Sequence, residues 1–417
     1  MQLRRVVVTG LGAITPLGND VNSFFHGLRT GVSGAGLITH FDTEKFKVKF
    51  ACEVKNFNTE DFFDRKEARK MDPFTQYAMV AADEAIHHSG ILQQTYNPDR
   101  IGVVWGAGIG GLSTFFAEIV DYARGDGTPR FSPFFIPKMI VDIAPGYISI
   151  KHGFRGPNYC TVSACASSTH SLIDAFNLIR LGKADAIVTG GSEAGVNEMG
   201  MGGFNALKAL STRNDSPETA SRPFDLDRDG FVLGEGSGAL ILEEYEHAIK
   251  RGAKIYAEVI GGGMSGDAYH MTAPHPDGIG ARNTMLAALE DAEITPEQID
   301  YVNVHGTSTP LGDIAEVKAI QAVFGEHAYN MNISSTKSMT GHLLGAAGAI
   351  EAVACVMSVM NDIVPPTINH FTDDPGLDPK LNFTFNTPQK RTVNIALSNT
   401  FGFGGHNTSI IVKKFNS

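Results

Sequence analysis

Residues 162–168 place one cysteine among small residues, just before an apolar helix. Apolar side chains recur at helical spacing over residues 166–181, Gly182 follows as a stop signal, and residues 186–189 predict a buried strand. Cys165 is therefore expected at a helix N-terminus, where unpaired N–H groups and the helix dipole favour the thiolate. Free cysteine is also a common buried apolar residue, so this stretch alone leaves both a nucleophile and a packing role open.

Two histidines in the C-terminal half lie on glycine-containing loops. His305 follows an apolar strand-like run, and loops at strand ends commonly form the sites of α/β proteins. His342 lies in the loop 334–348, which also holds Lys337 and leads into a very apolar helix. A lone histidine in such a loop is more often a structural residue than a catalyst, so neither residue decides the matter alone.

Two further features lie near these histidines in the sequence. Glu351 is the only charged residue in the apolar helix at 346–360, and a buried carboxylate there would need Lys337 as its partner. Near the C-terminus, the loop 398–407 carries Phe403 between glycines, which expose backbone N–H groups. That loop suits an oxyanion hole with a movable gate, and it suits a structural turn equally well.

The overall composition is that of an ordinary globular protein. The 417 residues are 42% hydrophobic and 19% charged, enough to bury a large core. A net charge of −11 argues against a broad nucleic-acid or anionic-membrane surface. No signal-like region precedes the first strand, and no uncharged segment reaches membrane-spanning length. Four cysteines without disulfide or zinc spacing agree with a reducing compartment, so the cytoplasm is expected.

Strands and helices alternate along the chain, which predicts an α/β fold. A strand at residues 5–9 ends in Gly10-Leu11-Gly12, but Thr15 stands where a dinucleotide turn needs its third glycine, and we expect no nicotinamide or flavin site. The strand at 254–260 likewise ends in three glycines, and the phrase at 97–104 recurs at 295–304. This weak repeat predicts two α/β halves, residues 1–250 and 251–417.

Two other stretches invite a functional interpretation. A helix opening at residues 64–70 and ending at Gly90 carries a basic face, formed by Lys66, Arg69 and Lys70. From composition alone a solvated surface is favoured over a docking patch for an acidic partner. Residues 225–230 copy the first half of a calcium loop, but Gly236 occupies the twelfth position, so we expect a tight loop and no calcium site.

Together, Cys165, His305, Lys337, His342 and the loop 402–405 resemble the elongating β-ketoacyl-[acyl-carrier-protein] synthases, the synthase II group of the thiolase superfamily. The resemblance runs from Val6-Val7-Val8-Thr9-Gly10 to Gly402-Phe403-Gly404-Gly405-His406-Asn407, essentially the whole chain. It implies a five-layered αβαβα fold with two pseudo-symmetric halves, and a homodimer.

The resemblance also implies a role for each chemical group. Cys165 would accept the acyl chain from acyl carrier protein (ACP) as a thioester. His305 and His342 would bind the malonyl thioester, promote loss of carbon dioxide and stabilise the enolate. Lys337 and Glu351 would orient the histidines, and the acyl-Cys165 carbonyl would rest on backbone N–H groups of Cys165 and Phe403.

The remaining positions follow from the same resemblance. Phe403 would act as a gate, Thr307 and Thr309 would bind the phosphopantetheine arm, and Ile109 would line the acyl pocket and limit chain length. The acidic carrier protein would dock on Lys66, Arg69 and Lys70, which reverses the preference drawn from composition. No metal or dissociable cofactor is implied, because phosphopantetheine arrives on the carrier protein; a structural monovalent cation near residues 225–238 is left open.

Departures from the family pattern are few, and the rival enzymes differ at identifiable positions. Cys160 is expected to serve packing, and His406 stands where a small polar residue is expected. A thiolase would need a second cysteine near the C-terminal glycine loop, and an initiating synthase would carry Asn in place of His342. A polyketide ketosynthase shares the full constellation and is the nearest rival. A non-catalytic chain-length subunit would be expected to lack Cys165.

Overall fold

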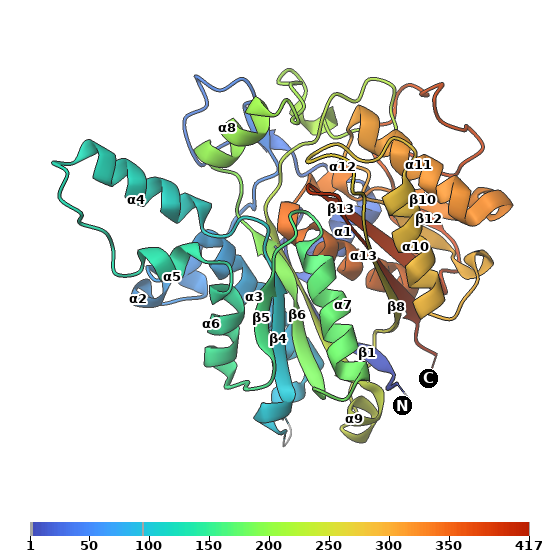
Figure 1. Ribbon diagram of the computed structural model, residues 1–417, viewed down its shortest axis with the longest axis horizontal. Helices are drawn as coiled ribbons and strands as arrows, with labels where there is room; N and C mark the ends of the chain where they lie inside the picture. Colours follow the sequence, from blue (N-terminus) through green and yellow to red (C-terminus); the bar gives the residue numbers. More distant parts are fainter. Residues whose placement is uncertain (1–2, 94–95, 417) are drawn as a thin grey trace.

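The computed structural model describes residues 3–93 and 96–416, and within them the strands form one large mixed sheet (Figure 1). Its strand order is β10-β9-β13-β14-β8-β1-β7-β6-β4-β5. The strands of the N-terminal half are β1 (Val6–Ile14), β4 (Ile101–Gly106), β5 (Asn158–Thr161), β6 (Ala186–Glu193) and β7 (Gly236–Glu244). Those of the C-terminal half are β8 (Ala257–Gly266), β9 (Tyr301–Asn303), β10 (Asn332–Ser334), β13 (Ile395–Gly402) and β14 (His406–Lys414).

The two halves of this sheet repeat one arrangement. In the first half β4 is parallel to β5 and β6, while β6–β7 and β7–β1 are antiparallel. In the second half β9 is parallel to β10 and β13, while β13–β14 and β14–β8 are antiparallel. The halves meet where β1 pairs with β8 over three residue pairs. The predicted two pseudo-symmetric halves are therefore present. The boundary at residue 250 falls at the end of α9 (Tyr245–Lys250).

Helices complete five layers around these strands. Two central helices, α7 (Ser167–Arg180) and α13 (Ala347–Asn361), contact strands of both halves. The outer face of the N-terminal half is covered by α3 (Pro73–Ser89), which contacts β1, β6 and β7. On the other side α10 (Ile279–Asp291) covers β8 and β14, with α11 (Pro310–Phe324) beside it. The expected αβαβα layering follows from these contacts.

The other elements are short or peripheral. The remaining α-helices are α1 (Val21–Thr30), α2 (Arg65–Ala68), α4 (Leu112–Arg124), α5 (Phe135–Met139), α6 (Ile143–His152), α8 (Glu198–Ala206) and α12 (Lys337–Thr340). Four two-residue strands pair locally, β2 (Gly36–Leu37) with β3 (Phe50–Ala51) and β11 (Ile363–Val364) with β12 (Gln389–Lys390). In Figure 1, α4 extends away from the body of the molecule, and α5 lies below it.

The first strand is longer than the sequence predicts. Gly10 and Gly12 were expected in a turn, but β1 continues through them to Ile14. A side-chain carbon at Gly10 or Gly12 would lie 2.0 or 1.9 Å from a backbone oxygen of α3, so bare glycine lets strand and helix approach closely. The same holds in β8, where a carbon at Gly263 would lie 2.0 Å from a backbone oxygen of α10.

The predicted helix between residue 64 and Gly90 is two helices. α2 ends at Ala68, and α3 begins at Pro73. The Asp72 side chain accepts a hydrogen bond from the Phe74 N–H, and proline suits a first helical position, so a new helix begins there. Gly90 ends it in the left-handed conformation, as predicted. The basic side chains Lys66, Arg69 and Lys70 are all exposed, but only Lys66 lies within α2.

One segment of the described chain is long and apolar enough to cross a membrane by length and composition, Leu344–Asn361. It includes α13 and carries Glu351. The share of this segment buried inside the protein is 83%, which is the environment of a core helix.

Candidate active site

Cys165 lies in the turn between β5 and α7, two residues before the helix begins. Ala164 adopts a φ of +51°, a conformation that non-glycine residues rarely take. The Ser167 hydroxyl stabilises this turn: it donates to the Ala164 carbonyl at 2.6 Å and accepts from the Ser163 N–H at 2.9 Å. Cys165 is only 8% exposed. The predicted helix-start position is confirmed, and the tight turn presents the thiol to the interior.

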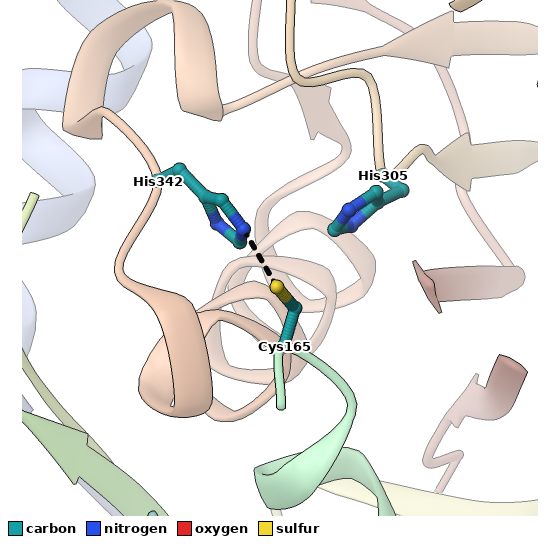
Figure 2. A group of neighbouring side chains, drawn as sticks. All are labelled: Cys165, His305 and His342. Carbon is teal, nitrogen blue, oxygen red and sulfur yellow. Dashed lines mark hydrogen bonds between the residues drawn. The ribbon is translucent and has the colours of Figure 1, made fainter. Parts of the chain in front are cut away.

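The two predicted histidines lie beside this thiol (Figure 2). The Nε2 atom of His342 lies 3.0 Å from the Sγ atom of Cys165. The His305 and His342 rings are 5.3 Å apart between centroids and nearly perpendicular. The Cys165 sulfur and one ring nitrogen of each histidine all lie within 4.8 Å of one another. Three residues from distant parts of the sequence thus share one small site.

His305 follows β9, and a buried carboxylate fixes its backbone. The Glu316 carboxylate on α11 accepts hydrogen bonds from the N–H groups of His305, at 2.9 Å, and Gly306, at 2.8 Å. The side-chain amide of Asn399 donates to the same carboxylate at 3.2 Å. Burial raises the pKa of Glu316 to about 7. The sequence analysis did not identify Glu316, because an acidic residue on a helix carries no local sign that its partners are distant N–H groups.

A segment of the N-terminal half fixes the backbone of His342. Its N–H donates to the Val232 carbonyl at 2.8 Å, and its carbonyl accepts from the Gly234 N–H at 2.9 Å. The Phe231 ring meets the His342 ring edge to face, with centroids 5.3 Å apart. Both the backbone and the ring of His342 are therefore held in place from the other half of the molecule.

Lys337 and Glu351 form a buried ion pair, as the sequence analysis predicts. Burial raises the pKa of Glu351, and the Lys337 ammonium opposes that rise. Burial, together with the positive charge of Lys337, holds the pKa of His305 and that of His342 well below the usual histidine value. Both imidazoles are consequently neutral at physiological pH.

The thiol of Cys165 is less acidic than its helix-start position suggests. Burial raises its pKa to about 12, while the Lys337 charge and the backbone N–H groups of Phe403 and Cys165 act in the opposite direction. The expectation that the helix N-terminus favours the thiolate is not met in the resting protein, because burial raises the pKa of this thiol. The groups that can favour the thiolate are those that face the sulfur, the His342 ring nitrogen and the Phe403 N–H.

The glycine loop after β13 closes over the cysteine turn. A side-chain carbon at Gly402 would lie 2.7 Å from the Ser163 carbonyl oxygen, so the two backbones touch. The Gly404 N–H donates to the Met271 carbonyl at 2.7 Å, and the Gly405 carbonyl accepts from the Asp267 N–H at 2.9 Å. The Phe403 N–H acts on the Cys165 sulfur and lowers its pKa, so this predicted oxyanion-hole donor lies beside the thiol.

A cavity of about 460 Å³ opens onto these groups. Its lining includes the three central residues and the other predicted substrate-binding positions, Ile109, Thr307, Thr309 and Phe403. The hydroxyls of Thr307 and Thr309 are 3.1 Å apart. The predicted docking residues Lys66, Arg69 and Lys70 are not among the residues that line it.

A second buried carboxylate was missed by the sequence analysis. Glu193, at the end of β6, accepts hydrogen bonds from three consecutive N–H groups, those of Gly108, Ile109 and Gly110, at 2.8–3.1 Å. It also accepts from the Gly345 N–H at 3.1 Å. Burial raises the pKa of Glu193. The turn that carries Ile109 is thereby joined to the segment that follows His342.

The two positions at which the sequence departs from the family pattern, Cys160 and His406, lie outside the cavity. Cys160 is partly buried in β5 and packs against the core of the N-terminal half, in agreement with a packing role. His406 is exposed at the start of β14, opposite Gly402 in the hairpin. The cavity lining does not include either residue.

Three comparisons with known proteins identify related chains. Residues 3–248 match the family "Beta-ketoacyl synthase, N-terminal domain", and residues 256–371 match "Beta-ketoacyl synthase, C-terminal domain". The chain is 51% identical over 415 residues to 3-oxoacyl-[acyl-carrier-protein] synthase 2 of Staphylococcus aureus, covering 99% of each protein.

Solved structures give the same result. A beta-ketoacyl synthase from Burkholderia phymatum aligns with a TM-score of 0.91 at 34% identity, covering 99% of this chain and 100% of that one. A type II polyketide ketosynthase, solved in complex with its acyl-carrier protein, aligns with a TM-score of 0.88 at 34% identity, covering 100% of both chains.

Proposed function

This chain belongs to the β-ketoacyl synthase family, and we infer that it condenses acyl-ACP with malonyl-ACP in fatty acid elongation, giving 3-oxoacyl-ACP, carbon dioxide and free ACP. It is an acyltransferase of the 3-oxoacyl-[acyl-carrier-protein] synthase 2 type. The observation that carries this conclusion is the juxtaposition of one buried thiol with two neutral imidazoles, 3.0 Å from thiol to nearer ring nitrogen. That set of groups suits acyl transfer followed by decarboxylation.

In the first step the Cys165 sulfur attacks the acyl thioester, the bond between the acyl carbon and the pantetheine sulfur breaks, and the proton that Cys165 loses ends on the departing pantetheine thiol. The His342 Nε2–H can donate to the sulfur as its negative charge develops. The backbone N–H groups of Cys165 and Phe403 stabilise the oxyanion of the tetrahedral intermediate. The turn before α7 holds the Cys165 N–H in place before substrate arrives, so the alignment of this donor costs little reorganisation during the reaction.

In the second step the two histidines act on the malonyl thioester. Loss of carbon dioxide leaves an enolate, whose oxygen requires hydrogen-bond donors. A neutral imidazole offers one N–H, and within the described residues the Nδ1 atoms of His305 and His342 have no hydrogen-bond partner. That favours protonated Nε2 atoms directed at the cavity. The enolate carbon then attacks the carbonyl carbon of acyl-Cys165, the carbon–sulfur bond to Cys165 breaks, and Cys165 is released while the 3-oxoacyl chain remains on the carrier protein.

We assign supporting roles to the rest of the lining. Thr307 and Thr309 bind the phosphopantetheine arm, because their adjacent hydroxyls lie in the same cavity as Cys165. Ile109 limits acyl chain length from its turn above Glu193. Phe403, in a glycine-rich loop beside the thiol, admits the acyl and malonyl groups by turns.

Carrier protein docking is assigned to the basic group Lys66, Arg69 and Lys70. All three side chains are exposed, and among the residues that the structure describes none of them forms an ion pair, which leaves their charges available to acidic side chains of a partner. Replacing the three by Glu should raise the KM for acyl-ACP and leave the KM for acyl-pantetheine unchanged. Lys390→Glu, at an exposed position of β12, is the control for a single charge reversal away from this group, to be compared with Lys66→Glu alone.

The chain is proposed to work as a homodimer. β5 lies at the edge of the sheet, where β4 is its only strand neighbour in the described chain. Nearby α4 buries one residue, Thr114, and otherwise exposes an apolar face. The exposed apolar side chains of this region are Phe115, Ile119, Tyr122, Phe131, Phe134, Ile136, Ile140 and Val162. A second copy would pair the open strand edge and cover this face.

Two further assignments are proposals of the same kind. We place the enzyme in the cytoplasm, in agreement with four free cysteines, three of which are buried. We divide the chain into halves 1–250 and 251–417, since α9 and β8 flank the boundary. Separate expression of the two halves would test whether each folds alone.

A polyketide ketosynthase is the second candidate, because one such enzyme shares the fold at 34% identity. The two activities differ in the number of condensations per chain. Mixing the protein with acyl-ACP and excess malonyl-ACP, without reducing enzymes, should give one product that is two carbons longer. Products extended several times would identify a polyketide ketosynthase, and the absence of any product would exclude both activities.

A further inference from the structure

Residues 222–234, here termed the bridging segment, belong to the N-terminal half but lie between the two histidine-bearing loops of the C-terminal half. Their contacts with His342, through Val232 and Gly234, are described above. The same segment contains the motif at 225–230 that the sequence analysis left without a function. A second set of its contacts leads to the loop that follows His305.

Ser308 is the centre of that second set of contacts. Its hydroxyl accepts a hydrogen bond from the Arg222 N–H at 3.1 Å, and its carbonyl accepts from the Gly230 N–H at 3.0 Å. Ser308 is fully buried and has a φ of +68°. A serine in this left-handed region is unusual and persists only where surrounding contacts hold it. The bridging segment supplies those contacts, and the conformation directs Thr307 and Thr309 into the cavity.

Arg228 reinforces the same turn from its far side. Its guanidinium donates to the Thr309 carbonyl at 3.4 Å and the Pro310 carbonyl at 3.3 Å. It also lies 3.5 Å from the Asp313 carboxylate, in the first turn of α11. The side chain is almost fully buried, so these contacts are made away from solvent screening.

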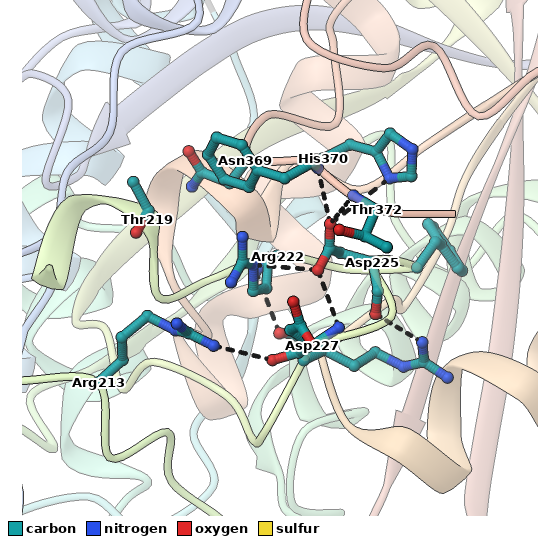
Figure 3. A network of polar contacts seen from close by, with 12 residues as sticks. Arg213, Thr219, Arg222, Asp225, Asp227, Asn369, His370 and Thr372 are labelled. Atoms are coloured by element: carbon teal, nitrogen blue, oxygen red, sulfur yellow. Dashed lines mark hydrogen bonds and ion pairs between the residues drawn. The ribbon is translucent and has the colours of Figure 1, made fainter. Parts of the chain in front are cut away.

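The guanidinium is in turn held by groups outside the turn. It donates to the Asp225 carbonyl and to the Asp374 carboxylate, both at 2.7 Å. Asp225 is itself anchored, since its carboxylate accepts from the Thr372 N–H at 2.8 Å and lies 3.3 Å from Arg222 (Figure 3). The Nη1 atom of Arg228 is therefore held by Asp225 and Asp374, while its Nε and Nη2 atoms donate to the Thr309 and Pro310 carbonyls.

We propose that Arg228 is a positioning residue for the phosphopantetheine arm, acting through the backbone of the turn formed by Thr307, Ser308 and Thr309. It does not line the cavity and has no contact with the thiol or the imidazoles. It sets where the two threonine hydroxyls stand, and so determines how well a pantetheine-linked substrate binds. This inference rests on the proposed assignment of Thr307 and Thr309 to that arm.

Arg228→Lys tests the role with the charge preserved. An ammonium group cannot reach two turn carbonyls, the Asp225 carbonyl and Asp374 at once, whereas the planar fork of arginine does. We expect the KM for malonyl-ACP to rise about tenfold, the equivalent of one weakened hydrogen-bonded contact, with kcat changed less. Decarboxylation of S-ethyl malonyl thioester, which has no pantetheine arm, should stay within about twofold of the wild-type rate.

Arg213→Lys is the matched control. Arg213 contacts the outer side of the same segment, donating to the Asp227 carbonyl at 3.0 Å, and it makes no contact with the turn (Figure 3). Arg213→Lys should leave unchanged both the KM for malonyl-ACP and the rate of decarboxylation of S-ethyl malonyl thioester. Ser308→Gly provides a second variant if Arg228→Lys folds poorly, because glycine accepts the positive φ while the hydroxyl acceptor is lost. It should also raise the KM for malonyl-ACP.

The possible outcomes distinguish the role of Arg228 from the proposed pantetheine site and from the proposed condensing activity. An unchanged KM for malonyl-ACP in both Arg228→Lys and Ser308→Gly would overturn the role of Arg228. An equal loss with malonyl-ACP and with the armless thioester would also overturn it, because the effect would then be a general loss of structure. A Thr307→Val/Thr309→Val variant with unchanged KM would instead reject the proposed pantetheine site. No decarboxylation by the wild-type protein would reject the function itself.

Discussion

The Nε2 atom of His342 lies 3.0 Å from the Sγ atom of Cys165, although the two residues are 177 positions apart in the chain. Cys165 is presented by the turn before α7, and His342 by the loop before α13. These two helices form the central layer between the half-sheets. The site therefore exists only when both halves of the molecule are packed together.

Replacing the thiol should separate the two chemical steps. Cys165→Ala removes the nucleophile but leaves His305, His342 and Lys337 in place. We expect condensation to fall by about 10³-fold or more, while release of carbon dioxide from malonyl-ACP continues. Radiolabelled malonyl-ACP allows both to be measured in one assay. Loss of decarboxylation together with condensation would show that the thiol is required for both steps.

The two steps should also differ in their dependence on pH. Burial raises the pKa of Cys165 to about 12, so the thiolate fraction, and the rate of alkylation by iodoacetamide, should grow about tenfold per pH unit from pH 6 to 9. The pKa values of His305 and His342 are lowered well below the usual value, so both stay neutral over this range. Decarboxylation should accordingly be flat. An alkylation rate that levels off near pH 7 would contradict the high thiol pKa.

Breaking the buried ion pair should affect stability and acidity in different ways. Lys337→Met leaves Glu351 buried without its partner, which we expect to cost about 3–5 kcal/mol in the free energy of unfolding. Loss of the positive charge also raises the pKa of both histidines, so decarboxylation should weaken at acidic pH. Urea unfolding and a pH–rate profile measure the two effects.

The double variant Lys337→Met/Glu351→Leu serves as the control for that experiment. Apolar residues at both positions should restore much of the stability, because no unpaired charge remains buried. The acid shift of the pH–rate profile should persist. A profile that returns to the wild-type shape would show that Lys337 acts on the histidines only through stability.

Glu316 should make the protein less stable as pH rises. Its pKa is raised to about 7 in the folded state, from an ordinary value near 4.5, so the folded protein retains a proton that the unfolded chain has lost. The free energy of unfolding therefore receives a contribution that falls between about pH 4.5 and 7. Glu316→Gln should lack this contribution, and denaturant titrations at several pH values would show a flatter profile. Parallel profiles for the two proteins would contradict the assignment.

The groups found from the sequence are those with a local signature. Cys165 lies in a run of small residues before an apolar helix, and His305 and His342 occupy glycine loops after buried runs, so their positions are visible in the sequence. The residues alone leave structural roles open, and only the resemblance to the β-ketoacyl synthases assigns their chemistry. Glu193 and Glu316 were not found, since their role depends on backbone N–H groups brought near them by folding. An acidic residue within an apolar element was the available signal, and it identified Glu351 only.

Errors in the predicted elements have a similar cause. Gly10 and Gly12 suggest a turn when sequence is considered alone, whereas the packing of α3 against β1 makes glycine necessary within the strand. The helix starting near residue 64 was extended across Asp72 and Pro73, a pair that caps and starts a new helix. Local signals predicted the order of elements well, and close tertiary packing determined their ends.

Intact-protein mass spectrometry provides the most direct test of the central claim, that Cys165 carries the acyl chain between the two steps. The protein is mixed with long-chain acyl-ACP, digested to map any adduct, and then treated with malonyl-ACP. We expect one acyl group on Cys165, absent in Cys165→Ala, that disappears on malonyl addition as a product two carbons longer and carbon dioxide form. Elongation without an adduct on Cys165, or an adduct that malonyl-ACP leaves in place, would contradict the account.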